Sequence, residues 1–142
     1  MPSTFSMKAM NAANRVLIRI SGGRFGWDLR GMPVLELTTT GRRSGEPRVN
    51  LLTSPLRVGG DYVVVASRGG DDAHPAWFLN LEANPDVLVS VRGEPAEPKR
   101  ARILEGPERL DVWERVVERH PHYGAYQRKT SREIPLVVLE TP

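Results

Sequence analysis

The sequence predicts a mostly β protein with flanking helices, an α+β fold built on an antiparallel sheet or a small barrel. Four segments rich in β-branched residues follow one another closely, and most links between them have hairpin length. A parallel doubly wound sheet would alternate strands and helices regularly, and this chain does not. A length of 142 residues fits one domain.

The N-terminal segment is expected to form an amphipathic helix over residues 4–21. Apolar residues recur there at spacings of three to five, basic residues lie between them, and Gly22 and Gly23 end the pattern. We therefore divide the chain into this helix, residues 1–23, and one domain, residues 24–142. The helix fits four roles, which the sequence leaves open: packing on the domain, covering a ligand, contacting a second copy, or resting on a membrane surface.

The strands of the domain are expected at residues 33–39, 48–58, 62–67 and 87–92. Gly59, Gly60 and Asp61 predict a tight hairpin turn between the second and third of them. Residues 62–66 are almost continuously apolar, which is typical of a strand buried on both faces.

The remaining elements are marked by proline and glycine. Pro75 suits the first turn of a short helix that ends near Asn84. Residues 97–104 are expected to return as a hairpin partner of residues 87–92. A helix then runs from Gly106 to Pro121, and a short helical turn over residues 123–129 precedes a last strand at residues 134–139.

Composition excludes several kinds of chemistry. The chain has no cysteine, so it holds no disulfide, thiolate zinc site, iron–sulfur cluster or cysteine nucleophile. The net charge of +3 comes from scattered arginines, whereas a nucleic-acid binder concentrates them on one element. No apolar run approaches the roughly 20 residues that span a bilayer, and no secretory signal is recognisable. We expect a cytoplasmic protein that binds no nucleic acid, with residues 4–21 as its one candidate for peripheral membrane contact.

The first candidate site is the segment TTTGRRSGEPRVN, residues 38–50. Its glycines allow backbone N–H groups to converge on an anion, and arginines add forked donors that match phosphate or carboxylate. The segment is neither a Walker A motif nor GxGxxG. Local chemistry alone leaves open whether it binds an anion or is a solvated hairpin turn.

The second candidate site, residues 67–77, follows a buried strand and leads into a helix N-terminus, where polar or negative ligand groups are favoured. Ser67 and Arg68 are expected at the strand end. Asp71, Asp72 and His74 resemble metal ligands, but no second histidine stands at a supporting spacing, so we expect no metal site.

The third candidate site is HPHYGAY, residues 120–126. Tyr123 and Tyr126 are three residues apart and so share one face of a helical turn, where their hydroxyls can bond a carbonyl or nitro oxygen or simply face water beside packed rings. No Ser-His-acid order and no GxSxG elbow is present, which disfavours a hydrolase.

Three long segments together carry a family resemblance: TTTGRRSGEPRVN, VVVASRGGDDAHPAWFLNLEANP and HPHYGAYQRKTSREIPLVVL. In order and spacing they resemble the deazaflavin-dependent nitroreductase family, small actinobacterial oxidoreductases that use coenzyme F420. The likeness covers residues 35–139. It implies an FMN-binding-like split β-barrel, with the deazaflavin across a groove and its phosphate and oligoglutamate tail held by basic residues.

The resemblance also implies roles for individual residues. The loop for the phosphate and tail matches Arg42, Arg43, Ser44, Gly45 and Arg48, with Asn50 just beyond it. The segment beside the deazaflavin ring matches Ser67, Arg68 and Gly69, and the helix bordering the cofactor matches Ala76, Trp77 and Asn80. The substrate side matches Tyr123 and Tyr126, and His120 stands where members noted for nitro or quinone reduction often carry tyrosine.

The implied reaction is hydride transfer from reduced F420 to an electron-poor small molecule: a quinone, an enone or unsaturated lactone, or a nitro compound. Tyr126, Tyr123 and Ser67 are the candidate catalytic residues, with the proton coming from Tyr126, Ser67 or water. Two alternatives stay open, a flavin reductase that binds FMN and a non-catalytic carrier of F420 or a lipid. The sequence does not distinguish a monomer from a homodimer.

Overall fold

A computed structural model describes residues 28–142. Its strands are β1 (Asp28–Leu29), β2 (Met32–Thr40), β3 (Pro47–Thr53), β4 (Leu56–Val58), β5 (Asp61–Val65), β6 (Asp86–Val91), β7 (Glu97–Ile103) and β8 (Leu136–Glu140). Its helical elements are the short 3₁₀ turn η1 (Arg68–Gly70) and the α-helices α2 (Ala76–Ala83), α3 (Gly106–Arg119) and α4 (His122–Arg128). The strand pairs within residues 28–142 are antiparallel, which confirms the expected sheet.

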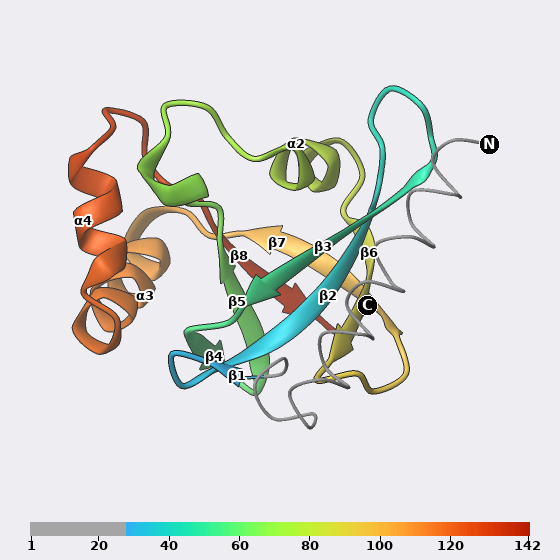
Figure 1. The fold of residues 1–142 in the computed structure, drawn as a ribbon, viewed down its shortest axis with the longest axis horizontal. Helices are drawn as coiled ribbons and strands as arrows, with labels where there is room; N and C mark the ends of the chain where they lie inside the picture. The colour runs from blue at the N-terminus through green and yellow to red at the C-terminus, as the bar shows by residue number, and fades with distance from the viewer. Residues whose placement is uncertain (1–27) are drawn as a thin grey trace.

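The sheet curls into a half-barrel (Figure 1). Its strand order is β1-β2-β6-β7-β8-β5-β4, with β3 also paired to β2. Thus β3 and β4 lie near opposite ends of this order, yet only Ser54 and Pro55 separate them in the chain. Because two residues cannot span a flat sheet of this width, the sheet has to bend round until its two ends approach.

The expectation of one strand over residues 48–58 is wrong, because Ser54 and Pro55 interrupt it and separate β3 from β4. Pro55 has no N–H for a ladder bond. Ser54, which is buried, makes the corner: its hydroxyl shares one proton between the carbonyl oxygens of Val63, at 2.7 Å, and Leu56, at 3.1 Å. At this corner the chain crosses from β3, near one end of the strand order, to β4 at the other end.

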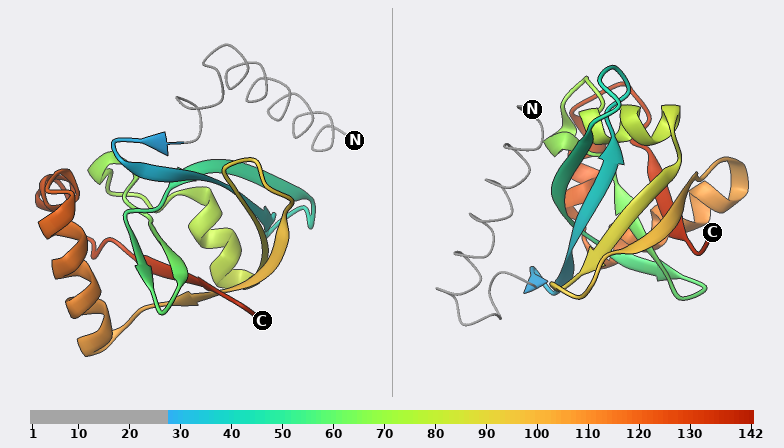
Figure 2. Two further views of the ribbon diagram at one scale, coloured as in Figure 1. Left: turned by 90° about the horizontal axis from the view of Figure 1, so that it is seen from below. Right: turned by 90° about the vertical axis from the view of Figure 1, so that its right-hand side faces the viewer.

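Two apolar cores lie on the two sides of the curled sheet. The inner core joins strand residues such as Leu35, Leu37 and Val64 to one helix, α2, through Trp77 and Phe78. Figure 2 shows α2 lying inside the curl of the strands. Its sequence, AWFLNLEA, suits this place, because Trp77, Phe78 and Leu81 are buried in the core while Glu82 stays exposed.

The outer core covers the other face of β5 and β8 with helices α3 and α4. Val63 and Val138 on the strands meet Val112 and Val116 of α3 and Tyr123 of α4. Successive residues of β5 therefore enter alternate cores, as Val63 and Val64 do. This confirms the expected strand buried on both faces, although β5 ends at Val65 rather than at residue 67.

Most other expectations are confirmed, with small shifts in boundaries. Gly59 and Gly60 both have positive φ, 57° and 88°, as a two-residue hairpin turn requires. The last strand begins at Leu136 rather than residue 134, since Pro135 precedes it. The expected helix over residues 4–21 lies outside the described residues. Within residues 28–142, no helix is long and apolar enough to cross a membrane.

Candidate functional site

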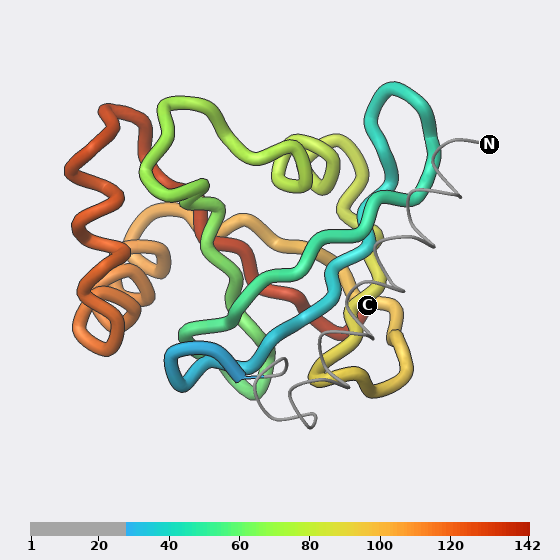
Figure 3. Tube along the Cα trace, in the orientation of Figure 1, coloured from blue at the N-terminus to red at the C-terminus, as the bar shows by residue number. Residues whose placement is uncertain are grey.

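The three candidate segments gather along one edge of the half-barrel. The loop after β2, the turn after β5 and helix α2 lie side by side at the top of Figure 1, with α4 at their left. The tube of Figure 3 follows the same path without the ribbon. Strand ends and short helices thus position groups from residues about 80 apart in the chain.

The loop between β2 and β3 is a closed, internally bonded turn. Gly41 N donates to Glu46 O and Gly45 N to Gly41 O, both at 2.8 Å. The Ser44 hydroxyl accepts from Glu46 N at 3.1 Å and from Arg48 Nη2 at 3.3 Å. Gly45 has a φ of 72°, which favours glycine.

The cationic side chains of this loop face solvent. Arg42, Arg43 and Arg48 are all exposed, and the hydroxyl of Ser44 lies between them in the chain. A fixed backbone that presents guanidinium groups outward suits an anionic ligand. The structure therefore gathers the expected anion-binding residues, and their ligand remains a prediction.

Asn80 joins this loop to helix α2. Its side-chain oxygen accepts from both the backbone N and the Nη1 of Arg42, each at 3.1 Å, and its Nδ2 donates to the Thr39 hydroxyl at 3.1 Å. Asn80 is only 4% exposed and Thr39 2%. Asn80 thus holds the loop in place; a direct contact with a cofactor stays a prediction.

The other residues expected around α2 have mixed surroundings. Trp77 is buried in the inner core, edge-on to Phe78 with ring centroids 6.5 Å apart. Ala76 is exposed at the start of the helix, and Asn50 is half-buried on β3 opposite Leu37. Of these, Ala76 is open to a ligand and Asn50 is partly so, whereas Trp77 would need the core beside it to rearrange.

The turn after β5 is strained and tightly packed. Arg68, Gly69 and Gly70 have φ of 46°, 64° and 87° in succession. Arg68 and Gly69 are exposed, whereas Ser67 is 9% exposed and Gly70 is buried. A Cβ on Gly70 would lie 2.6 Å from the carbonyl oxygen of Tyr126 in α4, so the turn and α4 are in direct backbone contact.

Asp71 and His74 of this segment have structural partners. Asp71 forms an ion pair with Arg68 at 3.5 Å, and His74 Nδ1 lies 3.1 Å from a guanidinium nitrogen of Arg132. Among residues 28–142, no three metal-binding side chains come together.

Helix α4 and the residues before it form an aromatic cluster. The rings of Tyr123 and Tyr126 are 6.0 Å apart and nearly perpendicular, and His122 lies 4.1 Å from the first and 5.4 Å from the second. Tyr123 is buried in the outer core, where its hydroxyl reaches the Met32 sulfur at 3.7 Å. Tyr126 and His120 are half-buried.

Burial shapes the titration of this cluster. It raises the pKa of the Tyr123 phenol and lowers the pKa of His122, which the nearby Arg30 also disfavours as a cation. Tyr123 therefore keeps its proton at neutral pH and packs as a core residue, while Tyr126 is the more open of the two to a substrate. The structure brings Tyr126 beside the turn after β5, with Tyr123 packed against it, and the roles of both in a reaction stay predictions.

The sequence alone gave no role to Arg132, although it lies within the segment HPHYGAYQRKTSREIPLVVL that carries part of the resemblance. It follows α4, and its guanidinium reaches across to the turn after β5. No periodicity or motif marks such a residue, because its partners are backbone carbonyls some 60 residues earlier in the chain.

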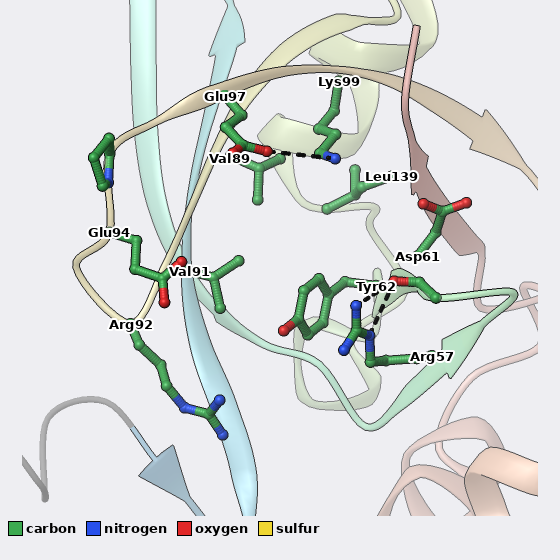
Figure 4. Close-up of a pocket in the computed structure, with 12 residues that line it drawn as sticks. Arg57, Asp61, Tyr62, Val89, Val91, Arg92, Glu94, Glu97, Lys99 and Leu139 are labelled. Atoms are coloured by element: carbon green, nitrogen blue, oxygen red, sulfur yellow. Dashed lines mark hydrogen bonds and ion pairs between the residues drawn. The ribbon is translucent and has the colours of Figure 1, made fainter.

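A separate hollow of 260 Å³ opens at the other end of the strands (Figure 4). Val89, Val91 and Leu139 line its floor, and charged residues of the β4–β5 and β6–β7 turns stand round its rim. Arg57 stacks on the Tyr62 ring there, 4.4 Å from its centroid. Since β5 begins at this hollow and ends near Ser67, the hollow is remote from the three candidate segments.

Comparison with known proteins connects these features to one family. Residues 11–141 match the family model described as F420H(2)-dependent quinone reductase. An F420H(2)-dependent quinone reductase of Mycobacterium tuberculosis is 40% identical over 129 residues, 87% of this chain and 84% of that protein. A second M. tuberculosis protein, a putative F420H(2)-dependent quinone reductase, is 32% identical over 110 residues, 76% of this chain and 89% of its own.

Solved structures agree with the fold. An F420-H2-dependent reductase has a TM-score of 0.66 at 44% identity, over 76% of this chain and 94% of that one. A protein described as a domain-swapped dimer has a TM-score of 0.68 at 37% identity, over 99% of this chain and all of that one. The antiparallel half-barrel with its helices is thus the split-barrel fold that the resemblance implied.

Proposed function

Because this chain belongs to the F420H(2)-dependent quinone reductase family, we propose that it is an oxidoreductase that reduces a quinone with coenzyme F420 as its hydride source. The observation that carries the proposal is one edge of the half-barrel, along which an exposed arginine loop, helix α2, a strand-end turn and the tyrosine-bearing helix α4 follow one another (Figure 1).

The residues present fit such a cofactor. F420 has a phosphate and an anionic oligoglutamate tail, and the loop offers the guanidinium groups of Arg42, Arg43 and Arg48 with the Ser44 hydroxyl. Gly41 keeps this loop tight, because a Cβ there would lie 2.7 Å from the Ser44 hydroxyl. We assign the tail and phosphate to these groups.

The ring side is assigned to the turn after β5. Ser67, Arg68 and Gly69 would border the deazaflavin, and exposed Gly69 leaves room for a flat ring to approach the backbone. Ala76 and Trp77 at the start of α2, with Asn80 one turn further on and Asn50 on β3, would complete the groove.

When bound and reduced, F420 supplies a hydride. The protein's own contribution is to position the acceptor and to stabilise the oxygen on which negative charge develops. We assign that part to the hydroxyl of Tyr126, with Tyr123 and His120 shaping the acceptor side and Ser67 as a second proton donor. Tyr123, whose buried phenol stays protonated, would act from the outer core by packing against the ring of Tyr126.

The acceptor class extends beyond quinones in our proposal. Enones, unsaturated lactones and nitro compounds also carry an electron-poor centre next to an oxygen that a tyrosine hydroxyl can bond. His120 makes the acceptor side more polar than a tyrosine would. The relative rates at which quinones, enones, lactones and nitro compounds are reduced should therefore differ between this chain and relatives that carry tyrosine there.

Titration of the purified chain with F420 and with FMN, followed by fluorescence, tests the cofactor. We expect F420 to bind; tight FMN binding with none for F420 would instead identify a flavin reductase. Oxidation of reduced F420 by menadione or a coumarin-type enone should then rise with enzyme concentration. Binding without turnover would identify a carrier.

Substitution tests the arginine loop. Arg43→Ala combined with Arg48→Ala should weaken F420 binding at least tenfold, because a charge-assisted hydrogen bond contributes about 1.5–3 kcal/mol and about 1.4 kcal/mol is a factor of ten. Both residues are exposed, so stability should change little. Arg115→Ala with Arg119→Ala, on the exposed face of α3, removes the same charge far from the loop and should leave affinity unchanged.

The assembly and the N-terminal segment complete the proposal. We divide the chain into an amphipathic helix, residues 1–23, and one catalytic domain, residues 24–142, and propose that copies form a homodimer, an idea supported by the related domain-swapped dimer. Light scattering of the chain with and without residues 1–23 tests this, and liposome flotation of the same two chains tests peripheral membrane contact.

A further inference from the structure

One guanidinium ties together the turn after β5. Arg132 Nε donates to Asp71 O at 2.7 Å, and its two Nη atoms donate to Ser67 O at 2.8 Å and Ala66 O at 3.2 Å. A single planar fork therefore bonds carbonyls at both ends of a six-residue segment. Each hydrogen bond from a charged donor is about twice as strong as a neutral one.

This segment requires outside support. It contains three residues in succession with positive φ, one of which, Arg68, is not glycine. Its own backbone hydrogen bonds are two, from Gly70 N to Ser67 O at 2.9 Å and from Asp71 N to Arg68 O at 3.2 Å. Backbone in such conformations persists only where its surroundings hold it.

Arg132 is itself fixed to helix α4. Gln127 Nε2 donates to Arg132 O at 2.7 Å, and Gln127 Oε1 accepts from Ile134 N at 3.0 Å. Gln127 follows Tyr126 directly on α4. The chain of bonds therefore runs from the tyrosine-bearing helix, through Gln127 and Arg132, to the turn that begins at Ser67.

The guanidinium also reaches the side of α2. Its Nη1 lies 3.1 Å from His74 Nδ1, and since a guanidinium can only donate, this nitrogen of His74 is the acceptor. The His74 ring in turn lies 4.9 Å from the ring of Phe78 on α2.

We propose that Arg132 is a positioning residue that sets the separation between the cofactor-side turn, residues 66–71, and the substrate-side helix α4. This rests on the proposed function for the identity of the two sides. Hydride transfer needs reacting atoms about 3–3.5 Å apart, and a misplacement of about 1 Å can lower the rate about 100-fold. Arg132 contacts neither hydride donor nor acceptor in this proposal; it acts through Ser67 and α4.

Arg132→Lys is the sharpest variant, because lysine keeps the charge but has one nitrogen and cannot bond three carbonyls from a planar fork. Its matched control is Arg102→Lys, since Arg102 donates to both carboxylate oxygens of Glu108, at 2.6 and 3.1 Å, on a surface outside the site. Both variants are made in the full chain.

Three measured quantities are expected to separate Arg132→Lys from its control. Without cofactor, the amides of Gly70 and Asp71 should exchange hydrogen faster, while those of β8 do not. With F420, kcat for menadione should fall about 10- to 100-fold with its KM nearly unchanged, and the F420 dissociation constant should rise. Arg102→Lys should match the parent in all three.

Unchanged exchange and unchanged kcat in Arg132→Lys would overturn the positioning role. If the parent itself fails to bind F420, the proposed function fails, while the exchange comparison still decides whether Arg132 holds the turn. Should Arg132→Lys not fold, Gln127→Met removes only the α4 end of the link. Parent-like exchange and turnover in that variant would likewise overturn the proposal.

Discussion

Asn80 offers the most direct test of how the site is held together, because one buried amide joins helix α2 to the arginine loop. Asn80→Ala removes the acceptor of two Arg42 hydrogen bonds and the donor to the Thr39 hydroxyl. Arg42 is exposed, so water can replace Asn80 there at a cost of about 0.5–1.5 kcal/mol. Thr39 is 2% exposed, and leaving its hydroxyl short of a partner costs about 1–3 kcal/mol.

We therefore expect Asn80→Ala to lower the free energy of unfolding by about 2–4 kcal/mol. Urea unfolding of the cofactor-free chain, followed by tryptophan fluorescence, measures it. The variant should also bind F420 more weakly, since Arg42 is no longer held by its backbone N–H. Asn84→Ala is the matched control: its side chain accepts one hydrogen bond, from Asp86 N at 3.1 Å, outside the loop.

The control should lose only about 0.5–1.5 kcal/mol and keep its F420 affinity. A double-mutant cycle sharpens the test, because Thr39→Val and Asn80→Ala should be coupled by at least about 0.5 kcal/mol. The role of Asn80 would be refuted if Asn80→Ala were as stable as Asn84→Ala, or if the effects of Thr39→Val and Asn80→Ala were strictly additive.

Three further predictions concern the turn and α4. Gly70→Ala should lower the free energy of unfolding by more than about 2 kcal/mol, because its Cβ would lie 2.6 Å from Tyr126 O and its φ is 87°. Gly69→Ala, at φ 64° in open space, should lower it by about 1–2 kcal/mol, and urea unfolding measures both. Because burial lowers the pKa of His122, folding favours its neutral form. The parent should therefore lose stability relative to His122→Asn as the pH falls below 6.5. Parallel curves of unfolding free energy against pH for the two proteins would contradict this. Tyr126→Phe should slow turnover with F420 affinity retained; full activity would show that the hydroxyl is dispensable.

The cores show what local pattern can and cannot predict. The apolar run from Tyr62 to Ala66 indicated a strand buried on both faces, and Val63 and Val64 do enter different cores. The segment over residues 48–58 looked like one strand by the same composition. Pro55 breaks it, and only the closure of the sheet explains why the chain turns there.

The candidate site also has a part that the sequence predicted and a part that it left open. Arginines and glycines in residues 41–48 predicted an exposed anion loop from their side-chain chemistry, since such groups act through what they present to solvent. The burial of Tyr123 in the outer core was left open by the sequence, because two tyrosines three residues apart share a helix face whichever partner that face meets.

By itself the sequence determined most of the elements, the residue types of three polar segments and, through the order of those segments, a family. Tertiary structure alone decided which of them touch. Asn80 meets Arg42 across 38 residues and Arg132 meets Ser67 across 65. Such pairs join side chains to groups that carry no local pattern, often backbone atoms common to every residue, so their meeting follows from the curl of the sheet.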